Sequence, residues 1–152
     1  MFGMMRLLDA CEKTADGSGS WGVKPIFGCE VYVAQGSRFD KSGPQTETNH
    51  LVLLAETDEG YKNLIKLVSA GYTEGFYYRP RIDKELIHRH HEGLIATTCC
   101  IGAHVPQAIL RSGKQNAEEE FRWWLDLFGE DYYIELQRHN IKEQELINQT
   151  LL

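Results

Sequence analysis

The sequence lacks several features that would define its class at once. It contains no run of about 18 apolar residues, so nothing in it predicts a membrane-spanning helix. Residues 1–6 have neither the charged beginning nor the small-residue cleavage site of a secretory signal. No Walker-type phosphate loop and no nucleophile elbow is present, which leaves P-loop nucleotidases and α/β-hydrolases without support.

The sequence also lacks an excess of positive charge and a regular spacing of cysteines that would indicate disulfide bonds. The 152 residues carry 16 basic and 22 acidic side chains, and the formal charge of −6 argues against a stand-alone nucleic-acid coat. A local basic groove remains compatible with this charge. The four cysteines, Cys11, Cys29, Cys99 and Cys100, show no framework spacing. They predict a reducing, cytoplasmic protein whose cysteines are core residues, metal ligands or without a role.

What the sequence does contain is an alternation of apolar, β-branched segments with amphipathic ones. Strands are predicted over residues 25–33, 51–55, 94–97 and 132–136, and helices over residues 1–13, 59–71, 84–92, 106–110, 116–128 and 141–152. Asp58 and Asp83 are the expected N-caps of two of these helices. Strands separated by such helices predict an α/β fold with a largely parallel sheet. The first and last helices lack capping and exit signals, which favours a fragment of a longer domain.

Several side chains could bind a metal ion. They are Glu30, His50, Cys99 or Cys100, His104 and His139. Functional residues of parallel α/β folds collect at the carboxyl ends of strands, and Cys100 and His139 each follow a predicted strand. Carboxylate, imidazole and thiolate together suit zinc or a similar ion. Each residue also has an ordinary structural interpretation, and no CxxC or HExxH motif decides between the two.

His50 raises a difficulty for a shared site. It precedes its predicted strand, so in a strictly parallel sheet it would lie at the end opposite Cys100. The two residues can meet only if the strand after His50 runs antiparallel.

Residues 76–81 mix aromatic side chains with Arg79 and Arg81. This composition is typical of segments that stack on bases or bind phosphates. The alternative is a packed loop with exposed arginines. Trp123 and Trp124 cannot both face the core from one helix, so one of them is expected to be partly exposed.

Six segments, in the same order along the chain, resemble the PHP (polymerase and histidinol phosphatase) domain of bacterial replicative DNA polymerase III alpha subunits. They are residues 22–39 with a Gly-Cys-Glu motif, 50–55 beginning His-Leu-Val, 59–64, 74–83 with Gly-Phe-Tyr-Tyr, 92–96, and 133–139 with Glu-Leu-Gln-x-His. From the first to the last, they extend over residues 22–139, which is most of the chain. The Gly-Phe-Tyr-Tyr and Gly-Ser-Arg-Phe blocks favour the polymerase branch of the superfamily.

The resemblance implies a fold and a ligand set. The fold is a partial, distorted TIM-like (β/α)7 PHP barrel, with residues 1–152 forming a single partial domain. The complete domain holds up to three divalent ions, of zinc, manganese or iron. Glu30 resembles the bridging and catalytic carboxylate, and His50 and Cys100 resemble two further ligands, which implies an antiparallel strand after His50. His139 matches a recurrent His that binds metal or substrate.

The remaining ligand motifs of the family are expected outside the chain. A His-x-His motif, an Asp and a Thr-Asp-His segment would precede Met1, and an Asn-Asp-x-His motif would follow Leu152.

The resemblance also implies a function. The parent would be a DNA-directed DNA polymerase, a nucleotidyltransferase of bacterial DNA replication that binds DNA and other polymerase subunits. Arg79 and Arg81, singled out by the composition of residues 76–81, would then be nucleic-acid contacts. The PHP domain would be either a metal-dependent phosphoesterase acting as a proofreading 3′–5′ exonuclease, or a non-catalytic module that binds the proofreading subunit. A small-molecule phosphatase is a remoter alternative. The chain alone is expected to be inactive, and to be marginally stable or to dimerise through open sheet edges.

Overall fold

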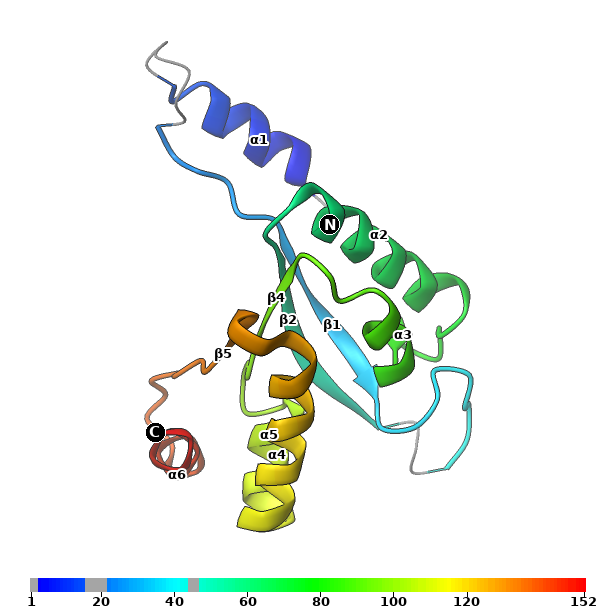
Figure 1. Cartoon of the computed structure of the whole chain (residues 1–152), viewed down its shortest axis with the longest axis vertical. Helices are drawn as coiled ribbons and strands as arrows, with labels where there is room; N and C mark the ends of the chain where they lie inside the picture. The colour runs from blue at the N-terminus through cyan, green and yellow to red at the C-terminus, as the bar shows by residue number, and fades with distance from the viewer. Residues whose placement is uncertain (1–2, 16–21, 44–46) are drawn as a thin grey trace.

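The computed structural model in Figure 1 describes residues 3–15, 22–43 and 47–152. The described residues form the α-helices α1 (Met4–Glu12), α2 (Asp58–Thr73), α3 (Lys84–Arg89), α4 (His104–Arg111), α5 (Lys114–Phe128) and α6 (Lys142–Leu151). They also form the 3-10 turn η2 (Gly129–Asp131) and the strands β1 (Gly28–Ala34), β2 (Thr48–Ala55), β3 (Arg81–Ile82), β4 (Leu94–Thr97) and β5 (Tyr132–Tyr133). None of the described helices is long and apolar enough to cross a membrane.

The strands form one mixed sheet in the order β3-β1-β2-β4-β5, so the expectation of a largely parallel sheet is wrong. Strand β2 is antiparallel to both β1 and β4, whereas β1–β3 and β4–β5 are parallel. The described part of the connection between β1 and β2 contains no helix, so the chain returns directly beside β1 and must run antiparallel to it. The antiparallel strand that His50 required is thereby confirmed.

The sheet is open. Among the described strands, β3 and β5 lie at its edges and each pairs with one neighbour. The α/β class and a part of a PHP-type barrel agree with this arrangement. Pairing of the free edges into a dimer stays a prediction.

Some helix and strand ends lie where the sequence predicted them, and others differ. Asp83 caps α3, as expected, by accepting the Leu86 N–H at 2.9 Å. The cap of α2 is Thr57 rather than Asp58, because the Thr57 hydroxyl accepts the Gly60 N–H at 3.0 Å. Strand β5 ends at Tyr133, short of the predicted residue 136, because the Glu135 N–H donates to the Thr98 side chain (2.8 Å) instead of a neighbouring strand.

The core lies on one face of the sheet, where alternate residues of β1 and β2 are buried. The buried cluster contains Val31, Val33, Leu51, Leu53, Leu64, Leu67, Leu86, Ile87, Trp124 and Phe128. Helices α2 and α3 cover this face (Figure 1). Of the two tryptophans, Trp124 is buried and Trp123 is partly exposed, which confirms that prediction.

Helix α2 begins against the turn before β4 at a distance that only glycine allows. A Cβ atom on Gly60 would lie 1.7 Å from the Gly93 carbonyl oxygen. That oxygen also accepts the Glu56 N–H at 3.0 Å, and Gly93 itself has a φ of 71°. The approach therefore fixes the start of α2 against the sheet.

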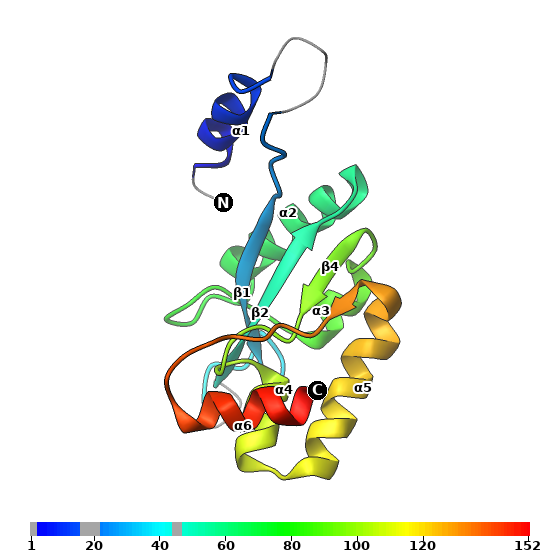
Figure 2. The ribbon, with the colours of Figure 1, turned by 90° about the vertical axis from the view of Figure 1, so that its left-hand side faces the viewer.

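The opposite face of the sheet carries Glu30, Tyr32, His50 and Val52, which alternate with the core residues and are exposed or half-buried. Figure 2 looks toward this face, with α6 and the connection that leads to it in front. Because α2 and α3 lie behind the sheet in this view, the open face is where polar side chains of β1 and β2 can meet a ligand.

Candidate metal centre

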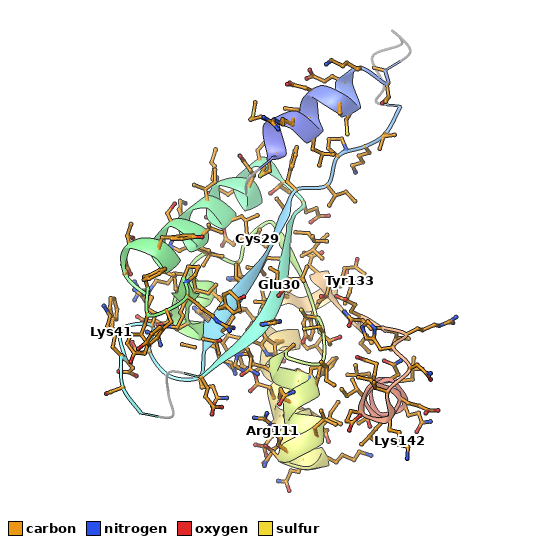
Figure 3. The ribbon with its side chains drawn as sticks, turned by 180° about the vertical axis from the view of Figure 1, so that it is seen from behind. Cys29, Glu30, Lys41, Arg111, Tyr133 and Lys142 are labelled. Carbon is orange, nitrogen blue, oxygen red and sulfur yellow. The ribbon has the colours of Figure 1, made fainter. Side chains whose placement is uncertain are left out.

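Three of the expected metal ligands meet on the open face of the sheet. The His50 Nδ1 atom lies 3.1 Å from Glu30 Oε1 and 3.2 Å from Cys100 Sγ. Glu30 comes from β1, as Figure 3 shows, His50 comes from β2, and Cys100 comes from the loop after β4. The pairing of the strands, rather than any local motif, brings these side chains together.

The strand register explains the meeting. Tyr32 is the cross-strand partner of His50, and Glu30 is the partner of Val52, so Glu30 and His50 are diagonal neighbours on one face. Because β2 is antiparallel to β4, the beginning of β2 lies beside the end of β4. His50 at the start of one strand therefore reaches Cys100 just beyond the end of the other.

A strained turn after β4 directs Cys100 toward the site. Cys99 has a φ of 58°, a left-handed conformation that is costly for residues other than glycine. The Cys99 N–H donates to the Thr97 hydroxyl at 3.1 Å. Cys99 itself is buried, and burial raises the pKa of its thiol to about 12. Of the two adjacent cysteines, Cys100 is thus the one available as a ligand.

Two residues that sequence reasoning missed hold His50 in place. The Gly102 carbonyl accepts the His50 N–H at 3.2 Å and the Asn49 side-chain amide at 3.0 Å. A Cβ atom on Gly102 would lie 3.4 Å from His50 Nδ1 and 3.6 Å from Cys100 Sγ. Glycine therefore leaves the space between these two donors open, and its place in the Cys-Cys-Ile-Gly segment was the available signal.

The donor set fits a divalent ion by its chemistry. Glu30, His50 and Cys100 offer one oxygen, one nitrogen and one sulfur, which suits zinc or a similar borderline ion. Within residues 3–15, 22–43 and 47–152, however, no three His, Cys, Asp or Glu side chains stand in a preformed metal-binding group. Tetrahedral ligands about 2.0–2.3 Å from zinc lie roughly 3.3–3.8 Å apart. The donors here are a few tenths of an ångström closer, at hydrogen-bond distances, so an ion would have to spread them.

The other two histidines that were candidate ligands, His139 and His104, lie apart from this trio. His139 is exposed, and its Nε2 atom contacts Gln137 Oε1 at 3.0 Å. Gln137 donates to Glu135 (2.7 Å), which also accepts the Thr97 hydroxyl (2.7 Å). No contact of His139 with the trio is found among the described residues, so its role in metal or substrate binding stays a prediction.

His104 is buried near Glu120, with Nδ1 3.6 Å from Glu120 Oε1. Burial lowers the pKa of His104 to about 4, a shift that Glu120 opposes and Lys84 assists. His104 is therefore a neutral core residue rather than a member of the candidate metal centre.

A cleft of about 620 Å³ opens beside His50, between β2, the 77–81 segment and α4. Of the two arginines expected to contact nucleic acid, Arg79 is exposed in its wall and Arg81 is 1% exposed. Arg81 donates to the carbonyl oxygens of Gly75 (3.0 Å), Arg38 (3.0 Å) and Asp40 (2.7 Å). The alternative of a packed loop with both arginines exposed is therefore wrong for Arg81. Its buried guanidinium joins the backbone of residues 38–40 to that of Gly75.

A protein-family profile and the similar proteins of known name indicate the same family for this chain. The profile of the PHP domain matches residues 1–139. The chain is 48% identical over 133 residues to the DNA polymerase III subunit alpha of Borreliella burgdorferi, covering 86% of the chain and 12% of that protein. It is 43% identical over 148 residues to the same subunit of Chlamydia trachomatis (96% and 11%) and 47% identical over 139 residues to that of Aquifex aeolicus (86% and 12%). The chain thus spans about one eighth of the length of these relatives.

Proposed function

Because the chain belongs to the PHP domain family, we propose that it supplies part of the metal centre of a PHP domain in a bacterial DNA polymerase III alpha subunit. In this proposal the domain is a metal-dependent phosphoesterase that acts as a proofreading 3′–5′ exonuclease. Its substrate is a DNA strand, its partners are the other subunits of the replicative polymerase, and its location is the cytoplasm. Polymerisation itself, a nucleotidyltransferase reaction, belongs to other parts of the larger protein.

One observation carries the proposal: Glu30, His50 and Cys100 come from three separate segments and meet around a single atom, His50 Nδ1. The contacts join β1, β2 and the loop after β4, so closeness in the sequence does not account for the convergence. The left-handed backbone at Cys99 and the absence of a side chain at Gly102 both favour this convergence.

The three side chains have distinct roles in this proposal. A bound divalent ion supplies Lewis-acid chemistry and an activated water at such a site. His50 would hold such an ion through Nδ1 as the neutral imidazole, with its proton on Nε2, and Cys100 would hold it as the thiolate. The Glu30 side chain is 52% exposed, so its carboxylate can hold the ion and still face the phosphodiester. Arg79, in the adjacent cleft, offsets the negative charge of that phosphodiester.

A second candidate function is a structural module that stabilises the polymerase and binds the proofreading subunit. The observation that favours it is the lack, among the described residues, of a preformed metal-binding group. Removal of the Glu30 carboxylate distinguishes the two functions, because it should abolish an exonuclease activity but should leave a purely structural role intact.

The test uses the complete alpha subunit that contains this sequence, with the variant Glu30→Gln. Glu59→Gln, an exposed position on α2, is the matched control. If the domain is an exonuclease, a chelator and Glu30→Gln should each lower 3′–5′ exonuclease activity, by roughly 10²–10⁴-fold for the variant, while polymerisation is retained. A folded subunit without bound metal or exonuclease activity would exclude the enzymatic role and leave the structural one.

A further inference from the structure

The cleft beside His50 concentrates positive charge on a chain whose formal charge is −6. Arg79, Arg81 and Arg111 line it, the first two from the 77–81 segment and the third from the end of α4. Among the described residues none of the three forms an ion pair, and Glu47 is the one acidic side chain among the lining residues. Figure 3 shows Arg111 on α4, a residue that sequence reasoning did not connect with the site.

Arg81 contributes a buried charge that its neighbours do not neutralise. Its Nε and Nη2 atoms donate to backbone carbonyls, but Nη1 has no hydrogen-bond partner among the described residues. A buried donor left unpaired costs about 1–3 kcal/mol, and more when it is charged. An anion in the cleft would compensate the positive charge of Arg81.

The turn before β3 places Arg79 next to the candidate metal centre. Tyr78 has a φ of 57° and is 86% exposed, and the Tyr77 N–H donates to the Arg79 carbonyl at 3.0 Å across it. The Arg79 guanidinium carbon lies 4.9 Å from the centre of the Tyr32 ring. Tyr32 in turn packs edge-on against His50, with ring centres 5.2 Å apart. Arg79 is therefore separated from His50 by one aromatic ring.

We infer that this cleft binds the phosphate group of a nucleotide, with Arg79 and Arg111 as its direct contacts and Arg81 as the buried charge beneath them. Guanidinium groups bind phosphate oxygens through paired N–H donors, and exposed aromatic rings such as Tyr78 stack on bases. This inference rests on the proposed function for its class of substrate, and it adds the residues that would bind the phosphate. The phosphate belongs either to a DNA strand or to a free nucleotide, and these two sources share one chemistry.

The test measures binding to the 152-residue chain in the presence of a chelator, so that the candidate metal centre plays no part. The probes are thymidine monophosphate, thymidine as its phosphate-free control, and a short single-stranded oligothymidylate. The variants are Arg79→Gln and Arg111→Gln. Arg6→Gln on α1, which removes the same charge away from the cleft, is the matched control.

Each cleft variant should weaken binding of the monophosphate or the oligonucleotide at least fivefold, whereas Arg6→Gln should not. For the single strand, the slope of log affinity against log salt should fall by about 0.7 for each arginine removed. Binding of the oligonucleotide alone identifies a strand as the source, and binding of the monophosphate alone identifies a free nucleotide.

Equal affinity of both cleft variants and the Arg6 variant, equal binding of thymidine and its monophosphate, or no binding of any probe would overturn the inference. Because a chelator is present, this outcome is independent of the metal-dependent test of the proposed function. Failure of the exonuclease test with intact phosphate binding would count against the proposed function alone.

Discussion

The Nδ1 atom of His50 lies 3.2 Å from the Sγ atom of Cys100, although the two residues are 50 positions apart in the sequence. The contact exists because β2 runs antiparallel to β4, which places the start of one strand beside the end of the other. With Glu30 on the neighbouring strand, it forms the candidate metal centre on which the proposed function depends.

Arg81 should be needed for folding more than for binding. Arg81→Met leaves the buried carbonyl oxygens of Gly75 and Arg38 without donors, so it should lower the free energy of unfolding by about 2–4 kcal/mol. Urea unfolding followed by circular dichroism measures this change. Arg79→Gln, at an exposed position, should stay within about 0.5 kcal/mol of the unchanged chain. Equal stability of the two variants would contradict the assigned role of Arg81.

Gly60→Ala should destabilise the chain although alanine favours helices. Propensity alone would make this change favourable by about 1 kcal/mol. The added Cβ atom would lie 1.7 Å from the Gly93 carbonyl oxygen, so α2 must shift against the sheet. We expect a net loss of at least about 2 kcal/mol in thermal or urea unfolding. Ser69→Ala, on the exposed side of the same helix, is the control and should be neutral or stabilising.

His104 should make stability depend on pH below neutrality. In the folded chain its pKa is lowered to about 4 by burial and Lys84, against the opposing effect of Glu120, from an ordinary value of 6.5. The unfolded chain therefore takes up a proton between these values that the folded chain does not. The resulting contribution to stability is complete above pH 6.5 and is lost as the pH falls toward 4.

This loss should amount to about 3 kcal/mol. Unfolding free energies at pH 7 and pH 4.5, compared between the unchanged chain and His104→Gln, isolate it from the titration of other groups. A pH dependence that is the same in both proteins would show that His104 is not the group responsible.

The sequence predicted the local elements better than their arrangement. Strand β4 has the predicted bounds, because Leu94 and Ala96 alternate with half-buried residues in a short apolar segment. The cap at Asp83 is likewise a local hydrogen bond. The direction of β2 and the early end of β5 depend on which strand or side chain lies alongside, which periodicity does not encode.

The same distinction applies to the candidate site. Residue type made Glu30, His50 and Cys100 candidate ligands, but only resemblance to a family selected them from the longer set, because their contacts join separate segments and leave no spacing pattern in the sequence. Gly102 and Arg111 were missed, since their roles arise from a close approach and from a cleft that only the folded chain creates.

The 152-residue chain alone should not hydrolyse a DNA strand at a measurable rate. Glu30, His50 and Cys100 complete at most one ion site, and family members are expected to use several. Incubation of the purified chain with a labelled single strand and manganese or zinc tests this expectation. Hydrolysis that disappears in Glu30→Ala would contradict it.

The central claim is that Glu30, His50 and Cys100 bind one divalent ion together. Titration of the chain with Co²⁺ tests it most directly, because a cysteine thiolate bound to cobalt produces a near-ultraviolet charge-transfer absorption. The matched control is Cys29→Ser, since Cys29 lies beside Glu30 on β1 but its side chain packs against the core on the other face. The account predicts one ion per chain, with the absorption retained in Cys29→Ser and lost in Cys100→Ser and His50→Ala; an absorption unchanged by Cys100→Ser, or no binding of cobalt at all, would contradict it.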